Sequence, residues 1–245
     1  MFALAPPAEG QTNWTESVIH TFTGGSDGGY PFAALIEDAN GVLYGTTQEG
    51  GSLGYGAAFT VTPPAQGQTT WTENVIHSFG GWAFYDAGSP DAGFVADASG
   101  NLYSTAADGG TELTNNGAIY ELSPQSGGGT DWTETILYSF KGGKDGAIPA
   151  LDILIDSKGA IYSTTDAGGK GNGTVFKLEP PGAGGTAWTL KVLYTFKGAP
   201  DGAQADGGLT VGKVGKNVVL FGTTLLGGAN GDGTIYELTG TGFAP

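Results

Sequence analysis

A sequence block that recurs four times is the strongest constraint on the fold of this chain. A Trp-Thr-x-x-(Val/Ile)-(Ile/Leu)-(His/Tyr)-(Ser/Thr)-Phe segment begins, at nearly even spacing, at Trp14, Trp71, Trp132 and Trp188. A second block, first seen as Leu43-Tyr-Gly-Thr-Thr, is followed in each copy by a Gly-Gly pair, and its aromatic residue recurs at Tyr44, Tyr103, Tyr162 and Phe221. Repetition at a fixed period indicates a repeat architecture in which every unit is one supersecondary structure.

Each unit contains four short runs typical of β-strands. In order they are represented by 32–36, 43–47, 56–61 and 71–79, and all are β-branched or aromatic and bounded by turn residues. No stretch has sustained helical periodicity. Asp-x-x-Gly sequences join the first run to the second, because Asp starts a turn with its side chain and Gly supplies the positive φ at its end. These turns are Asp38–Gly41, Asp97–Gly100 and Asp156–Gly159.

Four-stranded meanders repeated at this period predict an all-β fold, a β-propeller of four repeats with four-stranded antiparallel blades. The alternative is a β-helix, whose rungs are shorter. The whole chain, 1–245, is predicted to be a single propeller domain. Its repeats are approximately 14–70, 71–131, 132–187 and 188–245, and 1–13 is a leftover strand and linker of a preceding repeat.

The last unit contains only three of its runs, and the missing fourth run exists at the other end, as 14–22. We therefore expect the N-terminal strand to close the last blade, which would remove exposed sheet edges. The segment Phe2–Leu4 has the same pattern as the end of a third run, which the chain also contains at 236–238. Both segments therefore compete for the same strand position in the last blade. A chain of this kind closes as four blades or pairs with a second copy, a homodimer formed through the surplus N-terminal strand.

Composition and charge narrow the class of protein further. The chain has 47 Gly and 12 Pro, close to a low-complexity composition, but its 5 Trp, 10 Tyr and 12 Phe argue against disorder. No apolar run approaches the ~18 residues of a membrane span, so membrane insertion is not expected. The net charge of −15 disfavours nucleic acid and anionic lipid, and leaves cations, neutral glycans or basic proteins as partners. Without cysteine, thiol chemistry and zinc–thiolate sites are excluded.

The repeat resembles that of the bacterial GloVer-type family, the choice-of-anchor tandem-repeat proteins. The resemblance rests on Val-Ile-His-Thr-Phe followed by 24–28, on the turn at 38–41, and on 43–47 with its Gly-Gly pair. It covers nearly the whole chain in four copies. It implies an exported, cell-surface bacterial protein with a propeller-like structure and no established activity. The chain departs from the pattern because it shows neither a signal peptide nor an anchor, and because 212–216 replaces one Asp-x-x-Gly turn.

Carboxylates recur in the loops that lead into the first run of each unit. Because strand direction alternates, these loops share a face with the Gly-Gly loops, which is the face expected around the central channel. A ring of such carboxylates would suit a hard cation such as Ca²⁺. The alternative is that each Asp caps its own turn through local hydrogen bonds. The predicted metal-binding set is Asp27, Asp86, Asp145 and Asp201.

One loop is longer than its siblings and carries three aromatic residues, Trp82, Phe84 and Tyr85, followed by Asp86 and Asp91. Exposed rings beside carboxylates are typical of sugar-binding sites, so these five residues are the predicted ligand-binding set. The alternative is that the rings plug the channel or pack between blades.

The predicted function is therefore a non-catalytic, extracellular repeat domain that binds a glycan or a protein on its loop-rich channel face. The rival prediction is a carbohydrate-active hydrolase, because glycosidases need two carboxyl groups ~5–9.5 Å apart. The candidate catalytic residues for that interpretation are Asp86, Asp91, Asp108 and Asp145.

Overall fold

The computed structural model describes residues 1–7, 9, 12–111, 114–125 and 132–245. It consists of antiparallel β-sheets and one short 3-10 turn, as the repeat pattern predicts. Within this described part, no helix is long and apolar enough to cross a membrane. The boundary predicted at residue 131, and residues 8, 10 and 11 of the predicted linker, lie outside the described residues.

Three consecutive sheets contain all four strands of the predicted meander. The first is β3 (Ile36–Glu37), β4 (Leu43–Thr47), β5 (Ala57–Thr62) and β6 (Thr72–Ser78). The second is β8 (Val95–Ala96), β9 (Leu102–Ala106), β11 (Ala118–Ser123) and β12 (Thr133–Ser139). The third is β14 (Leu154–Ile155), β15 (Ile161–Ala167), β16 (Thr174–Glu179) and β17 (Thr189–Thr195), with β13 (Ala147–Pro149) also paired to β15. Each sheet therefore takes its fourth strand from the start of the following sequence repeat.

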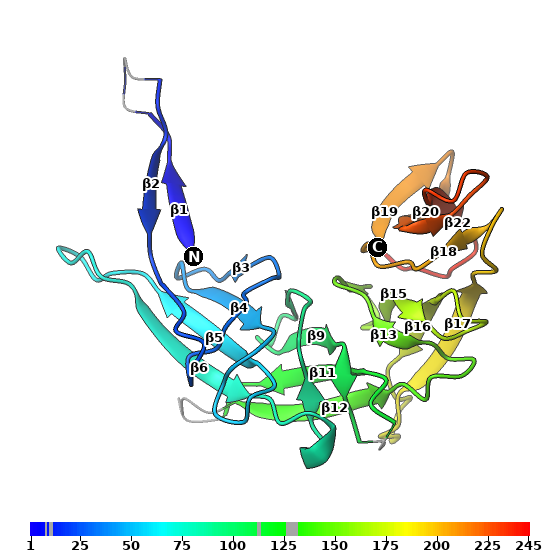
Figure 1. The fold of residues 1–245 in the computed structure, drawn as a ribbon, viewed down its shortest axis with the longest axis horizontal. Helices are drawn as coiled ribbons and strands as arrows, with labels where there is room; N and C mark the ends of the chain where they lie inside the picture. The colour runs from blue at the N-terminus through cyan, green and yellow to red at the C-terminus, as the bar shows by residue number, and fades with distance from the viewer. Residues whose placement is uncertain (8, 10–11, 112–113, 126–131) are drawn as a thin grey trace.

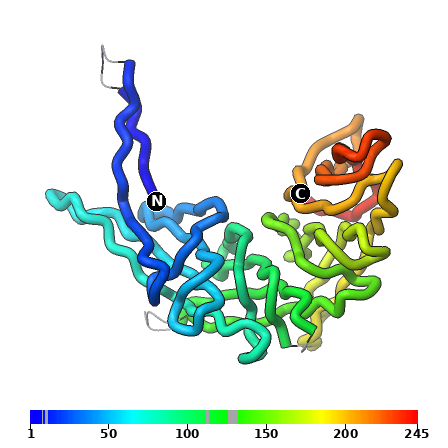
Figure 2. Tube along the Cα trace, viewed as in Figure 1, coloured from blue at the N-terminus to red at the C-terminus, as the bar shows by residue number. Residues whose placement is uncertain are grey.

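The two ends of the chain hold smaller sheets. At the N-terminus β1 (Phe2–Ala5) pairs with β2 (Thr15–Val18) as a hairpin. At the C-terminus β19 (Thr210–Val214), β20 (Asn217–Thr224) and β22 (Thr234–Leu238) form a three-stranded sheet. Figures 1 and 2 show the sheets following one another along an open arc, with the hairpin projecting from one end and the C-terminal sheet at the other.

The predicted closure of the last blade by the N-terminal strand is wrong. Strand β2 pairs with β1, with Phe2 opposite Val18 and Leu4 opposite Glu16, and not with β22. The reason is that Phe2–Leu4 carries the same pattern as 236–238, so either segment can pair with β2. A hairpin closes a short loop, whereas pairing with β22 would close a loop of nearly the whole chain, at greater entropic cost.

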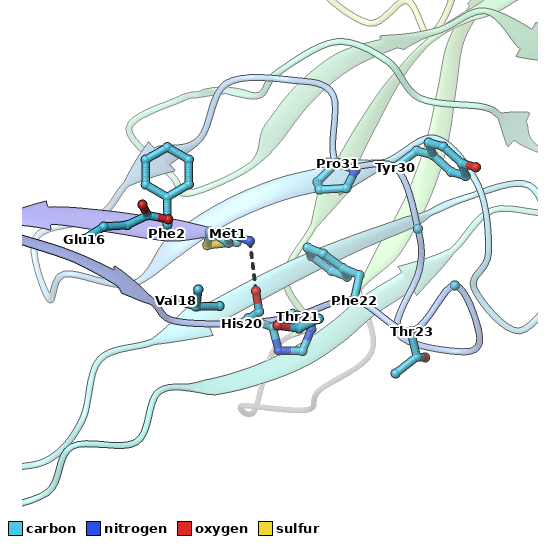
Figure 3. A pocket seen from close by; sticks show the side chains of 12 residues that line it. Met1, Phe2, Glu16, Val18, His20, Thr21, Phe22, Thr23, Tyr30 and Pro31 are labelled. Atoms are coloured by element: carbon cyan, nitrogen blue, oxygen red, sulfur yellow. Dashed lines mark hydrogen bonds between the residues drawn. The ribbon is translucent and has the colours of Figure 1, made fainter.

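An open groove of about 490 Å³ lies between the hairpin and the segment that follows it, 20–31. Figure 3 shows Phe2 and Val18 from the hairpin on one side and Phe22, Tyr30 and Pro31 on the other. The amino group of Met1 donates a hydrogen bond of 2.8 Å to the His20 carbonyl at its edge. The hairpin leaves its apolar side chains largely exposed, since no further strand among the described residues pairs with it.

The hydrophobic core lies in three seams between neighbouring sheets. In each seam a Phe that ends an outer strand meets, edge to face, the aromatic residue in the middle of the next sheet, as Phe79 meets Tyr120 at 5.1 Å. Phe140 meets Phe176 in the same way at 5.4 Å. Trp132 packs on the first seam beside Tyr44, so the Trp of the repeat contributes to the seam as well.

Side chains on the second strand of one sheet also donate hydrogen bonds to backbone carbonyls of the next unit. Thr46 donates to the Ala92 carbonyl at 3.0 Å, and Thr105 donates to the Ala150 carbonyl at 2.8 Å. The Asp-x-x-Gly turns form as predicted: Asp38 accepts hydrogen bonds from the N–H groups of Asn40 and Val42, and Gly41 has a φ of 79°. The repeat sequence thus specifies both the turns within a sheet and the contacts between sheets.

Candidate functional site

The loops that lead into each sheet meet the Gly-Gly loops, as strand alternation predicts. Short strands β7 (Ala87–Gly88) and β10 (Asp108–Gly109) pair in the second unit. Strands β18 (Gly202–Ala203) and β21 (Leu226–Gly227) pair in the fourth. A bridge between Gly29 and Glu49 does the same in the first. The candidate residues predicted from the sequence are carried by this pair of loops.

The long loop of the second unit forms an ordered turn that presents three aromatic side chains. It contains the 3-10 turn η1 (Trp82–Phe84), which is the coiled ribbon beyond β12 in Figure 1. Backbone hydrogen bonds from Phe84, Tyr85 and Asp86 return to Gly81 and Trp82 and fix the turn. The exposed fractions are 43% for Trp82, 59% for Phe84 and 58% for Tyr85. These rings face solvent, so they neither plug a channel nor pack between sheets.

Asp86 ends this loop, but its carboxylate turns inward. One oxygen accepts a hydrogen bond of 2.7 Å from the Gly80 N–H, and the other lies 3.7 Å from Nε2 of His77. Glu134, from the outer strand of the second sheet, joins the same group, so the three residues place their ligand atoms within 4.8 Å of one another. Glu134 also accepts a hydrogen bond of 3.3 Å from the Ala87 N–H.

The pKa values of the two carboxyl groups in this cluster, Asp86 and Glu134, are shifted in opposite directions. Burial raises the pKa of Glu134 to about 10, with a further contribution from the neighbouring Asp86. Burial also opposes ionisation of Asp86, but His77, Glu134 and the Gly80 N–H outweigh it and lower its pKa. Glu134 therefore carries a proton while Asp86 is ionised, because two adjacent buried carboxylates repel each other.

The other three members of the predicted cation ring each bind their own turn. Asp27 accepts hydrogen bonds from the N–H and hydroxyl of Thr23. Asp145 accepts from the Lys141 N–H at 3.0 Å and from the Tyr138 hydroxyl at 2.9 Å. Asp201 repeats this arrangement with Lys197 and Tyr194. These contacts are those of the turn-capping alternative, and a calcium ring formed by the four residues stays a prediction.

Carboxylates from the loops of different units also act on one another through their charges. Asp91 is mostly buried, and one of its oxygens has no hydrogen-bond partner among the described residues. Its pKa is raised to about 6, by burial first and then by the charges of Asp206 and Asp108. Burial and Asp206 also raise the pKa of Asp166. The charge of Asp108 thus acts on Asp91, and the pairing of β10 with β7 also places Asp108 beside the end of the loop that carries Asp86. Asp145 has its own partners within its turn.

Sequence reasoning did not find His77 as a neighbour of Asp86, nor Glu134, nor Asp206. Glu134 had a usable signal, because Glu follows Trp-Thr in three of the four repeats, at 16, 73 and 134. Asp206 also had a signal in the sequence, because it follows Asp201 at the same spacing at which Asp91 follows Asp86. The structure supports this alignment, since the matched residues Gln204 and Ser89 both have a positive φ, of 56° and 51°.

The pH dependence of stability reports on Asp91. Its pKa is about 6 in the fold against an ordinary value of 3.8, so the folded state binds the proton more tightly. Stability should therefore fall as pH rises from about 4 to about 6, by at most about 3 kcal/mol. We expect Asp91→Asn to flatten this dependence and to raise the melting temperature at pH 7. Asp232→Asn, which removes an exposed carboxylate, is the charge-matched control; an equal effect of both variants would contradict the assignment.

The fold and these loops define the chain as an all-β repeat protein built from four-stranded antiparallel units. A family model described as the Gloeobacter/Verrucomicrobia repeat matches residues 95–244, more than half of the chain. The chain belongs to this family, which confirms the resemblance seen in its sequence blocks. No curated protein matches it.

Solved structures also resemble the chain. One is Trypanosoma rangeli sialidase in complex with sialic acid, a β-propeller neighbour with a TM-score of 0.53 and 12% identity. The match covers 94% of this chain, which spans 40% of the length of the sialidase. Another is a protein of unknown function from Dyadobacter fermentans, with a TM-score of 0.46 and 11% identity, covering 93% of this chain and 65% of that one. At so low an identity, the sialidase match is a likeness of fold alone.

Proposed function

We propose that this protein is a binding domain for neutral glycans, held on the aromatic surface formed by Trp82, Phe84 and Tyr85. The observation that carries the proposal is that three exposed aromatic residues belong to one turn fixed by backbone hydrogen bonds. Aromatic rings cover the apolar faces of sugars, and a surface that is already ordered loses little entropy on binding.

The chemistry of the chain favours an uncharged sugar. The sequence contains no arginine, the side chain best suited to bidentate binding of a carboxylate. The net charge of −15 also repels anionic ligands. An acidic sugar such as the sialic acid bound by the sialidase neighbour is therefore a poor candidate ligand.

The test is a screen of neutral and anionic oligosaccharides, followed by titration of the hits. We expect binding to neutral glycans only, and about a tenfold loss of affinity in Trp82→Ala. Tyr30→Ala is the matched control, because Tyr30 is an aromatic residue, 69% exposed, in the corresponding loop of the first unit. Unchanged affinity in Trp82→Ala, or an equal loss in the control, would refute the aromatic surface.

A second candidate function, glycoside hydrolysis, is favoured by Asp91, whose pKa is raised by burial and by the charges of Asp206 and Asp108. A carboxyl group whose pKa is about 6 can hold a proton near neutral pH, and Asp108, whose charge acts on Asp91, is our candidate for the second carboxyl group that such a reaction needs. Glycans that bind should therefore also be incubated for turnover. Release of sugar by the wild type that is abolished in Asp91→Asn would replace the non-catalytic interpretation with the hydrolase.

A further inference from the structure

The buried cluster beneath the aromatic loop holds polar atoms that no described group of the protein satisfies. Nε2 of His77 and one carboxylate oxygen of Asp86 are both buried and have no hydrogen-bond partner. They lie 3.7 Å apart, too far for a hydrogen bond. Buried polar atoms are nearly always paired, so two facing unpaired atoms indicate a place for a ligand between them.

The same arrangement recurs one unit earlier. Nε2 of His20 lies 3.7 Å from Asp27, and Glu73 occupies the position of Glu134. His20 and Glu73 again have buried polar atoms without partners. These two clusters supply four of the seven such side-chain atoms in the described part of the chain. In the second unit the three ligand atoms lie close enough to share one ion.

The third unit has no histidine at the position of His77. There Tyr138 stands in place of His77 and donates a hydrogen bond of 2.9 Å to Asp145. Leu190 stands in place of Glu134, so that unit has a single carboxylate, which accepts hydrogen bonds from the Tyr138 hydroxyl and the Lys141 N–H. The second unit, with His77 and Glu134, therefore has buried polar atoms without partners among the described groups, whereas the carboxylate of the third unit is hydrogen-bonded within the protein.

We propose that His77, Asp86 and Glu134 bind a divalent transition metal of the Zn²⁺ class, which displaces the proton of Glu134 to solvent, with water completing the coordination. One imidazole nitrogen and two carboxylate oxygens suit Zn²⁺ better than Ca²⁺, which takes six to eight oxygen ligands. Ligands about 2.1 Å from a tetrahedral ion lie about 3.4 Å apart, close to the 3.7 Å between His77 and Asp86.

Hydrogen bonds that orient the ligand side chains also fit a metal site. The Gly80 N–H holds the other oxygen of Asp86, and the Ala87 N–H holds Glu134, as outer contacts orient ligands in metal sites. A groove of about 230 Å³ also borders His77, with Val75, Ser78 and Trp132 among its other lining residues. The ion would bind independently of any glycan, so the two proposals fail separately.

The experiment titrates untagged, EDTA-treated protein with Zn²⁺ by calorimetry, and with Co²⁺ by visible absorption. We expect one tight ion per chain, a higher melting temperature with Zn²⁺, and no such shift with Ca²⁺. His77→Tyr and Glu134→Leu copy the third unit, and each should weaken Zn²⁺ binding about 100-fold or more. His20→Tyr is the matched control and should keep the tight ion. Circular dichroism confirms folding, and Glu134→Gln takes the place of a variant that does not fold.

Three outcomes would overturn the proposal. The first is wild-type protein that binds no Zn²⁺, which would leave a shared proton as the occupant of the cluster. The second is unchanged binding in both His77→Tyr and Glu134→Leu. The third is an equal loss in His20→Tyr, which would assign the ion to another part of the chain.

Discussion

Replacing Phe140 by Ala should destabilise the protein by about 3–5 kcal/mol, the usual effect of removing a large buried aromatic side chain. Phe140 is fully buried at the end of β12 and contacts Phe176 of the next sheet edge to face. It therefore belongs to the middle one of the three seams, which joins the second and third sheets. Because each unit of a repeat array contacts only its neighbours, weakening one seam uncouples the units on either side.

The measurement is urea unfolding followed by tryptophan fluorescence. We expect a lower midpoint in Phe140→Ala and a transition that splits into two steps, one for each side of the weakened seam. Phe22→Ala is the matched control, because Phe22 occupies the same repeat position, contacts Phe59 at 5.0 Å and is only partly buried. A loss below about 1 kcal/mol in Phe140→Ala, less than the usual effect of such a truncation, would show that the seams do not carry the fold.

Most of the local structure could be predicted from the repeat, because it depends on residues close in sequence. The Asp-x-x-Gly turn at Asp38 needs only an Asp side chain and a glycine with positive φ, and both features are in the sequence. The strand runs are likewise set by alternation and by their bounding turns. The pairing of β2 with β1 was missed because two segments, Phe2–Leu4 and 236–238, carry the same pattern, and pattern alone does not rank them.

The site was harder to predict because its members come from different units. The loop sequence predicts Asp86 as a ligand-binding residue, but its inward direction depends on the Gly80 N–H and on His77. Glu134 belongs to the following sequence repeat and joins the cluster only because adjacent sheets pack side by side. The exposed rings of 82–85 were easier to recognise, since the loop is longer than its siblings and its aromatic residues are local.

The glycine that directly precedes the third strand of each unit should be one of the least replaceable positions in the chain. The four glycines share a positive φ between 85° and 98°, at Gly56, Gly117, Gly173 and Gly233. At Gly117 a Cβ atom would lie 2.6 Å from the Ala106 carbonyl oxygen and 2.5 Å from Cδ of Pro149. Backbone and a proline ring cannot move aside as a flexible side chain can, so we expect Gly117→Ala to cost at least about 3 kcal/mol.

Gly54→Ala separates the steric effect from the conformational one. Gly54 has a φ of 87°, almost the same as the 88° of Gly117, but a Cβ atom there would meet nothing within 4 Å. It should lose only about 1 kcal/mol, the usual penalty for a left-handed alanine. Thermal unfolding of both variants gives the difference, which belongs to the contact between the strand start and the next unit. Equal losses would mean that the glycines serve the turn alone, and that the close approach of neighbouring units does not require them.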